Sequence, residues 1–249
     1  MFMKFIIPCY NVGDTIGRML DSILSQTFTD YHIVCVEDCS TDNTWEILQK
    51  YGELNPDKIT LLKNPKNLGA GASRNRGYDM TIETLQSEFI WMVDGDDYIA
   101  DDNVLEDIYG FVKGHGELDM INIGFNFCSG YHINCRLNWP APWTNIIRTV
   151  KYVHFLDKNI HCEDVYQHFI TVDVVDDDKI GNFNRLCYVV PQAGLHKNTV
   201  SLKQNIAREI GLGLMEHVFR KPKVVELFMS DKGKWIKRCF KEFELKHSF

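Results

Sequence analysis

The chain has 249 residues, of which 45% are hydrophobic and 24% are charged, and its formal net charge is −7. This is ordinary globular composition, and it excludes low-complexity, collagen-like and disordered chains. The acidic balance argues against broad, non-specific binding to nucleic acid or to anionic membranes. The charge is uneven, because residues 201–249 carry a net +5 and the first 200 residues carry −12. We therefore expect one large domain over 1–202 and a helical, basic extension over 203–249.

The eight cysteines and the apolar runs give no sign of a metal ribbon or a membrane span. No two cysteines form a C-x-x-C pair, so neither a zinc ribbon nor a thioredoxin-like site is predicted. No run approaches the ~18 apolar residues of a transmembrane helix, and the first residues lack the pattern of a signal peptide. We expect reduced thiols and a cytoplasmic location.

Strand-like and helix-like segments alternate along the first half of the chain. Short apolar runs predict strands at 4–7, 33–36, 59–62, 89–93 and 120–125. Apolar residues at helical spacing predict helices that begin after Asp14, after Ser40-Thr41-Asp42, at about Ser73 and after Asp101 or Asp102, with these polar residues as caps. Another short strand is expected at 187–190. The alternation predicts an α/β domain with a mostly parallel central sheet.

Polar and acidic residues follow three of the predicted strands. Ligands bind at the carboxyl ends of parallel strands, where this chain places Pro8, Tyr10, Asn11, Glu37, Asp38, Asp94, Asp96 and Asp97. Three carboxylates within residues 94–97 repel one another unless a cation lies among them. Oxygen ligands suit Mg²⁺ or Mn²⁺, which commonly bridge carboxylates and phosphates. A solvated turn without any ion is the alternative reading of the same four residues.

A glycine-rich segment, residues 67–77, precedes the third predicted helix. It lacks the Gly-Lys-Ser/Thr ending of a P-loop and does not complete the dinucleotide fingerprint. It could be a tight connection, but its Arg74 and Arg76 could also face a diphosphate or a base.

Taken in order, these segments resemble the family 2 glycosyltransferases with the A-type nucleotide-sugar fold. The resemblance rests on Ile6–Asn11, Leu24–Phe28, Val36–Thr44, Asn67–Gly77, Asp94–Asp97, Trp143–Arg148, Glu163-Asp164 and His196–Ser201. Three positions depart from the family pattern: Ser73 where alanine is usual, His196 where arginine is frequent, and Glu37 where the shorter Asp is commoner. The resemblance spans roughly residues 3–201 and implies a single Rossmann-like domain.

The resemblance also implies a role for each motif. The donor nucleotide would be bound by Pro8, Tyr10, Asn11, Glu37, Asp38, Asn67, Gly71, Arg74, Asp94, Asp96 and His196, with uracil as the expected base. Asp96, Asp97 and Asp94 would hold the metal. Trp143 and Trp139 flank prolines in a loop, where aromatic faces can form an acceptor platform; ordinary packing is the alternative interpretation, above all for Trp139. Asp164 would be the catalytic base of an inverting, non-processive transfer of one sugar to a glycan or lipid-linked saccharide. Glu163 would either orient Asp164 or bind the acceptor. Without the resemblance, the preferred interpretation of the pair 163–164 is an acidic helix start that complements the helix dipole.

The basic extension carries an apolar stripe within 231–247. Trp235, Ile236, Cys239, Phe240 and Phe243 share one helical face, with lysines around it. Such a helix either lies on anionic lipid at the inner face of the membrane or docks on protein, including a second copy of the chain.

Three other functions compete with sugar transfer. A sugar-phosphate nucleotidyltransferase would need a Gly-rich, basic loop directly after the first strand, and residues 8–13 do not supply one. A binding module that has lost catalysis would bind donor without turnover. A DNA-modifying glycosyltransferase is disfavoured by the −12 body, so no nucleic-acid partner is expected.

Overall fold

The computed structural model describes residues 1–127, 131–133, 145–152, 154 and 174–191. The strands in this part of the chain are β1 (Met3–Cys9), β2 (Tyr31–Glu37), β3 (Ile59–Lys63), β4 (Phe89–Met92), β5 (Tyr98–Ile99), β6 (Met120–Phe127), β7 (Tyr131–Ile133), β8 (Asn145–Arg148) and β9 (Ile180–Val190). The α-helices are α1 (Ile16–Leu24), α2 (Thr44–Leu54), α3 (Ala70–Thr81) and α4 (Val104–His115), and short 3₁₀ helices span Thr149–Lys151 and Asp177–Lys179. None of the helices in these ranges combines the length and apolar character needed to cross a bilayer.

All the described strands join one mixed sheet. Its order is β3-β2-β1-β4-β8-β6-β9-β5, and β7 pairs with β6. The pairs among β1, β2, β3 and β4 are parallel, as the alternating pattern predicts. Beyond β4 the sheet differs from the prediction, because β8 runs antiparallel to both β4 and β6, while β9 is parallel to β6. The α/β fold is therefore confirmed, with its parallel character concentrated in the first hundred residues.

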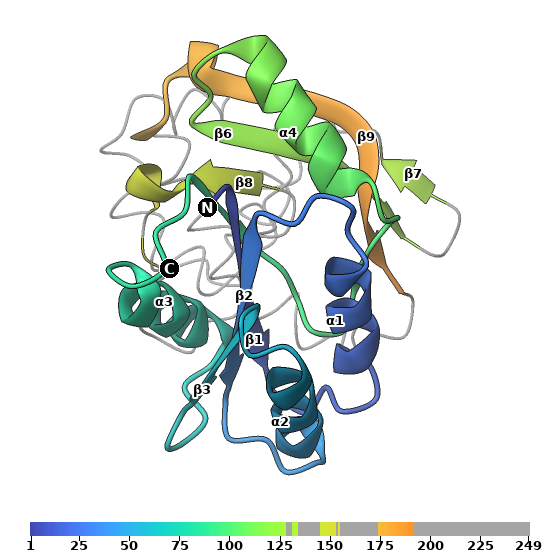
Figure 1. Cartoon of the computed structure of the whole chain (residues 1–249), viewed down its shortest axis with the longest axis vertical. Helices are drawn as coiled ribbons and strands as arrows, with labels where there is room; N and C mark the ends of the chain where they lie inside the picture. Colours follow the sequence, from blue (N-terminus) through green and yellow to red (C-terminus); the bar gives the residue numbers. More distant parts are fainter. Residues whose placement is uncertain (128–130, 134–144, 153, 155–173, 192–249) are drawn as a thin grey trace, which may run out of the picture.

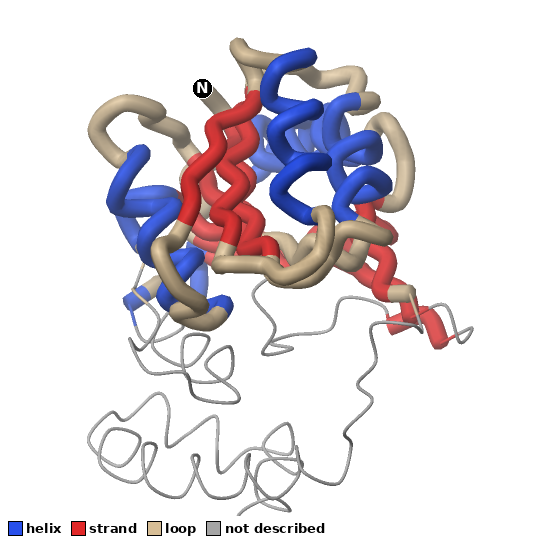
Figure 2. The backbone as a smooth tube through the Cα atoms, turned by 90° about the horizontal axis from the view of Figure 1, so that it is seen from below, coloured by secondary structure: helices blue, strands red, loops and turns tan. Residues whose placement is uncertain are grey.

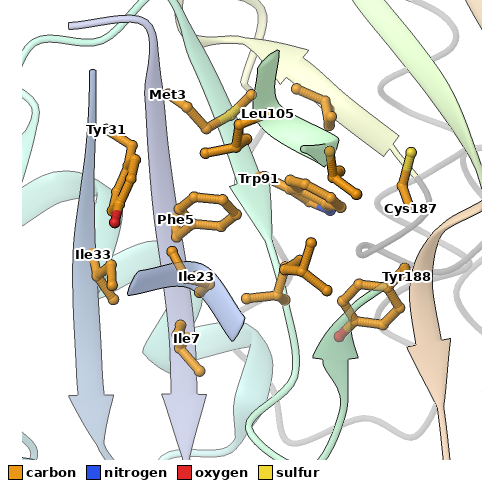
Figure 3. Close-up of a cluster of buried hydrophobic side chains, with 14 of the residues drawn as sticks. Met3, Phe5, Ile7, Ile23, Tyr31, Ile33, Trp91, Leu105, Cys187 and Tyr188 are labelled. Atoms are coloured by element: carbon orange, nitrogen blue, oxygen red, sulfur yellow. The ribbon is translucent and has the colours of Figure 1, made fainter. Parts of the chain in front are cut away.

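Helices cover both faces of the sheet, as Figures 1 and 2 show. Alternate residues of a strand point to opposite faces, so β1 divides its apolar side chains between two cores. Phe5 and Ile7 belong to the larger core with residues of α1 and α4, whereas Ile6 packs with Tyr78 of α3. Figure 3 shows the larger core between the sheet and its helices. Burial on both faces explains why these strands read as continuous apolar runs.

The strand β1 continues through Pro8 instead of ending before it. Proline has no N–H for a strand ladder, so a central strand normally excludes it. Pairing of β1 with β4 ends at Ile6, whereas pairing with β2 continues to Cys9. Pro8 thus lies where β1 has a hydrogen-bonded neighbour on one side, and the missing donor costs the sheet little.

The predicted helix caps are largely wrong. The residues at the N-cap positions of α1 and α4 are Thr15 and Asn103, without a side-chain cap bond, in place of Asp14 and Asp101 or Asp102. Asp42 comes nearest to the prediction, since its Oδ1 accepts the N–H of Thr44, the first residue of α2, at 3.0 Å.

A buried lysine lies beneath α3 on the smaller core. The side chain of Lys4 in β1 is fully buried, and its Nζ donates to Thr81 Oγ1 at 3.1 Å. Burial lowers the pKa of Lys4 to about 8, because an ammonium group loses its hydration in the core.

Candidate active site

The carboxyl ends of β2, β1 and β4 lie side by side, so the polar residues that follow them meet at one edge of the sheet. Cys9 is opposite Glu37 in the β1–β2 ladder, and Ile6 is opposite Met92 in the β1–β4 ladder. The predicted meeting of these strand ends is therefore confirmed by the registers. It follows from parallel pairing, which places all three carboxyl ends at one edge.

The loops that follow β1 and β2 are tied to each other. Asn11 has a φ of 52°, and its side-chain oxygen accepts the N–H of Thr41 at 2.8 Å. Its own N–H donates to Ser40 Oγ at 3.1 Å. Tyr10 precedes Asn11 in this loop and is 46% exposed, while Pro8 is half-buried. An exposed aromatic ring on a fixed loop is suited to stacking on a base.

Asp38 anchors the glycine-rich loop. Its carboxylate is buried and accepts the N–H groups of Leu68 and Gly69, both at 2.8 Å. It also accepts Asn64 Nδ2 at 2.6 Å. The neighbouring Glu37 is equally buried and accepts the N–H of Ser40. The two acids predicted to contact the base thus fix the loop after β2 and the glycine-rich loop before α3.

Asn64 was not among the residues that sequence reasoning singled out. Its amide joins Asp38 to Ser73 Oγ at 2.9 Å, and its oxygen accepts Arg76 Nη1. Ser73, which departs from the usual alanine of the family pattern, is fully buried at this junction. The departure was the available signal, since a buried hydroxyl needs a polar partner.

The helix α3 begins directly after the loop at Ala70, three residues earlier than predicted. Gly69 precedes it with φ 89°, a conformation that favours glycine. Asn67, at the start of the glycine-rich segment, is exposed, and Gly71 is buried in the first turn of α3. Further along, Gly77 lies so close to the sheet that a Cβ would come within 2.6 Å of Ile6 Cγ2.

A buried arginine of α3 pairs with Asp94, the first residue of the acidic turn Asp94–Asp97 that follows β4. Arg74 is 4% exposed, and its Nη2 lies 2.6 Å from Asp94 Oδ1. Tyr152 is close enough for the guanidinium to lower its pKa, although burial raises the pKa of that phenol more strongly. The phenol donates to Asn75 Oδ1 at 2.9 Å. Arg76 turns away and donates to the carbonyl of Lys63, so of the two arginines predicted to face the donor, Arg74 is the one that contacts the acidic turn.

The carboxylates of Asp94, Asp96 and Asp97 form a cluster in which one oxygen from each lies within 4.8 Å of the others. Burial, with the nearby charges of Asp94 and Asp96, raises the pKa of Asp97 to about 9. Arg18 of α1 lies beside the turn and donates to the carbonyl of Asp96 at 2.6 Å. The hard oxygen ligands and their mutual repulsion fit a divalent cation such as Mg²⁺ or Mn²⁺.

Tyr188 of β9 reaches the same turn, and sequence reasoning missed it. Its hydroxyl accepts the N–H of Asp94 at 2.9 Å and donates to the Asp97 carboxylate. The available signal was a tyrosine within the apolar run 187–190, because a buried phenol requires a hydrogen-bond partner.

Several predicted residues lie outside the described part of the chain. They are Asp164, Glu163, Trp139, Trp143, His196 and the segment 203–249 with its basic stretch 231–247. Their predicted roles, and the domain boundary after residue 202, stay predictions.

The chain resembles known glycosyltransferases in sequence and in fold. It is 36% identical over 115 residues to poly(ribitol-phosphate) beta-glucosyltransferase of Bacillus spizizenii, a match over 45% of this chain and 17% of the relative. It is 34% identical over 96 residues to the Escherichia coli glucosyltransferase WfaP, over 39% of this chain and 36% of the relative. The chain thus matches well under two thirds of either relative.

The crystal structure of Staphylococcus aureus TarS 1–349 in complex with UDP-GlcNAc aligns with a TM-score of 0.67 and 23% identity. It matches 84% of this chain and 66% of that one, which supports the A-type fold. The family model for glycosyl transferase family 2 matches residues 4–178. Together with the ordered motifs at the strand ends, this match shows that the chain belongs to glycosyl transferase family 2.

Proposed function

We propose that the chain transfers one sugar from a UDP-sugar to a glycan or lipid-linked saccharide, in a metal-dependent reaction that inverts the anomeric centre. The observation that carries the proposal is the cluster of Asp94, Asp96 and Asp97, paired with Arg74, at the edge of the sheet where the exposed Tyr10 follows β1. A diphosphate needs positive charge close to it, and a nucleobase needs a flat contact surface. Both requirements are met within this edge.

The donor would lie across the ends of β1, β2 and β4. Tyr10 would stack on uracil, and Asp38 would hydrogen-bond the base, with Glu37 beside it. Asp94 and Arg74 would lie toward the ribose and diphosphate. UDP as the nucleotide is supported by the fold-related TarS, which was solved with UDP-GlcNAc.

The three clustered carboxylates would hold Mg²⁺ or Mn²⁺, with Asp96 as the main ligand. When bound, the cation supplies positive charge that offsets the negative charge developing on the nucleoside diphosphate as it leaves. Arg74 adds positive charge next to Asp94, since its Nη2 lies 2.6 Å from Asp94 Oδ1. The leaving group would thus be bound between fixed groups of the protein.

The acceptor side of the reaction rests on residues known from the sequence. Asp164 would take the proton of the attacking hydroxyl, and Glu163 would orient it. A single base with direct attack gives inversion. His196 would contact the diphosphate, while Trp143 and Trp139 would form a surface for acceptor sugars.

The acceptor class is supported by the names of the relatives. One acts on poly(ribitol-phosphate) and another on a diphosphoundecaprenol-linked sugar. We propose an acceptor of this general kind at the cytoplasmic face of a membrane. The segment 231–247 would either bind the anionic membrane surface or form a dimer with a second copy of the chain.

A donor screen tests the proposal. Hydrolysis of UDP-, GDP- and TDP-sugars is measured with Mn²⁺ and after chelation with EDTA. We expect one UDP-sugar to be hydrolysed, and Asp96→Asn to lose on the order of 10²–10³-fold in rate. Asp102→Asn is the matched control, since its carboxylate is exposed and accepts the hydroxyl of Ser25 at 2.6 Å, outside the three clustered carboxylates. Full activity in EDTA would exclude the metal.

The base and the stereochemistry are tested on acceptor transfer. Asp164→Asn is expected to bind UDP as the wild type does while transfer stops. Proton NMR of the fresh product reports the anomeric configuration. Unchanged turnover in the variant would remove Asp164 as base, and retention of configuration would refute direct displacement.

A further inference from the structure

Tyr188 links the acidic turn to a strand far along the chain. It lies on β9, 94 positions from Asp94, and its side chain is fully buried. Figure 3 shows it at the border of the larger core, near Trp91. The two ring centroids are 6.2 Å apart. The ring is therefore a core side chain, while its hydroxyl faces the turn.

The hydroxyl contacts both ends of the turn. It accepts the backbone N–H of Asp94 at 2.9 Å, and it donates to the carboxylate of Asp97. The turn is also closed by the N–H of Asp97, which lies 3.3 Å from the carbonyl of Asp94. A phenol has one proton and two lone pairs, so one group can make both contacts at once. The first and last residues of the turn are thereby held at one point.

The backbone fixes that point in space. Tyr188 is opposite Ile99 in the β5–β9 ladder and opposite Phe125 in the β6–β9 ladder. β5 begins at Tyr98, directly after the turn. The turn is thus bonded to β9 twice, through the hydroxyl and through the strand that follows it. A phenol held by two ladders and a packed core has little freedom to leave Asp97.

We infer that Tyr188 is a positioning residue for the acidic turn, which holds the Asp97 carboxylate beside Asp94 and Asp96 so that the three converge on a divalent cation. This inference rests on the proposed function, because it assigns Tyr188 to the metal site of that reaction. Groups that hydrogen-bond to metal ligands typically change metal affinity by about 10–100-fold when they are removed.

The test compares Tyr188→Phe with the wild type. Phenylalanine keeps the ring in the core and removes only the hydroxyl. Tyr51→Phe is the matched control, since it removes a phenol that donates to Asp21 Oδ1 at 2.7 Å, away from the acidic turn. Mn²⁺ binding is measured by electron paramagnetic resonance with UDP present, and UDP binding is measured by calorimetry without metal.

We expect Tyr188→Phe to weaken Mn²⁺ binding by about tenfold or more, with UDP binding in the absence of metal within twofold of the wild type. Tyr51→Phe is expected to leave Mn²⁺ binding unchanged. A purely structural role of the hydroxyl would lower the melting temperature of Tyr188→Phe and leave its Mn²⁺ affinity unchanged, and that result would overturn the inference. Wild-type Mn²⁺ affinity in folded Tyr188→Phe would overturn the inference.

A second measurement does not depend on any variant. The amide proton of Asp94 is expected to exchange slowly with solvent in the metal-free wild type, because its acceptor is a buried phenol. Rapid exchange of that amide would overturn the inference even if Tyr188→Phe did not fold. Mn²⁺ binding without hydrolysis of any donor would refute the proposed function alone, and absence of Mn²⁺ binding by the wild type would refute both.

Discussion

Replacement of Asp38 by asparagine is expected to destabilise the protein even when no nucleotide is bound. One carboxylate oxygen accepts both Asn64 Nδ2 and the N–H of Leu68, and the other accepts the N–H of Gly69 at 2.8 Å. Asparagine can keep its oxygen toward the first pair only by turning its NH₂ toward Gly69. Two donors then face each other in a buried site.

The size of the effect follows from that lost bond. A hydrogen bond to a charged acceptor contributes about 1.5–3 kcal/mol, and a buried N–H left without an acceptor adds to the loss. We expect about 3 kcal/mol in total. For a protein of this size, each kcal/mol lowers the melting temperature by about 2–4 °C, so the expected decrease is roughly 6–12 °C.

The assay is thermal unfolding without nucleotide, followed by UDP titration. The control is Asp21→Asn, which changes an exposed carboxylate that accepts from Tyr51 Oη, and it is expected to shift stability by less than about 0.5 kcal/mol. If Asp38→Asn melted with the wild type and only lost UDP affinity, Asp38 would serve the base alone. The anchoring of the loop by this carboxylate would then be refuted.

Three further predictions concern other parts of the domain. Lys4→Met is expected to raise stability at pH 7 by about 1–2 kcal/mol, since burial lowers the pKa of Lys4 in the folded protein from its ordinary value of 10.5 to about 8. Between these two pH values only the wild type should gain stability, and parallel pH profiles of the two proteins in urea unfolding would contradict this. Gly77→Ala should lower the free energy of unfolding by about 1–3 kcal/mol in the same assay, because the added Cβ would come within 2.6 Å of Ile6 Cγ2. An unchanged midpoint would show that the side chain of Ile6 can move aside without cost. Cys39, exposed beside Asp38, should react with N-ethylmaleimide more slowly when UDP and Mn²⁺ are bound, as peptide mass spectrometry would report; equal rates would place the donor elsewhere.

The first half of the fold could be predicted closely because its strands are buried on both faces. Runs such as 33–36 and 89–93 contain little but apolar residues, and each lies within or almost within an observed strand. The strand β9 was predicted only at 187–190, although it spans Ile180–Val190. Its first half alternates between more and less exposed residues, so it lacks the continuous apolar signal of a fully buried strand.

The helix starts were predicted less well, and the reason is physical. An Asp before an apolar series is a common cap, but other contacts can take its carboxylate. Asp101 accepts the N–H of Asn103 and pairs with Arg185, and Asp102 accepts the hydroxyl of Ser25. Those partners lie on other elements or within the turn itself, and local spacing does not reveal them.

The sequence by itself determined the order of the strands and helices from β1 to β4, the three strand ends that form the site and the acidic turn that follows β4. These features depend on local periodicity and on parallel pairing, which brings successive carboxyl ends to one edge. Tertiary structure decided which groups fix the site, namely the pairing of Arg74 with Asp94, the anchoring of the loop by Asp38 and Asn64, and the contact of Tyr188 with the turn. Such contacts join residues up to 94 positions apart. They depend on strand register and on how far a buried side chain reaches, and neither is encoded in a local pattern.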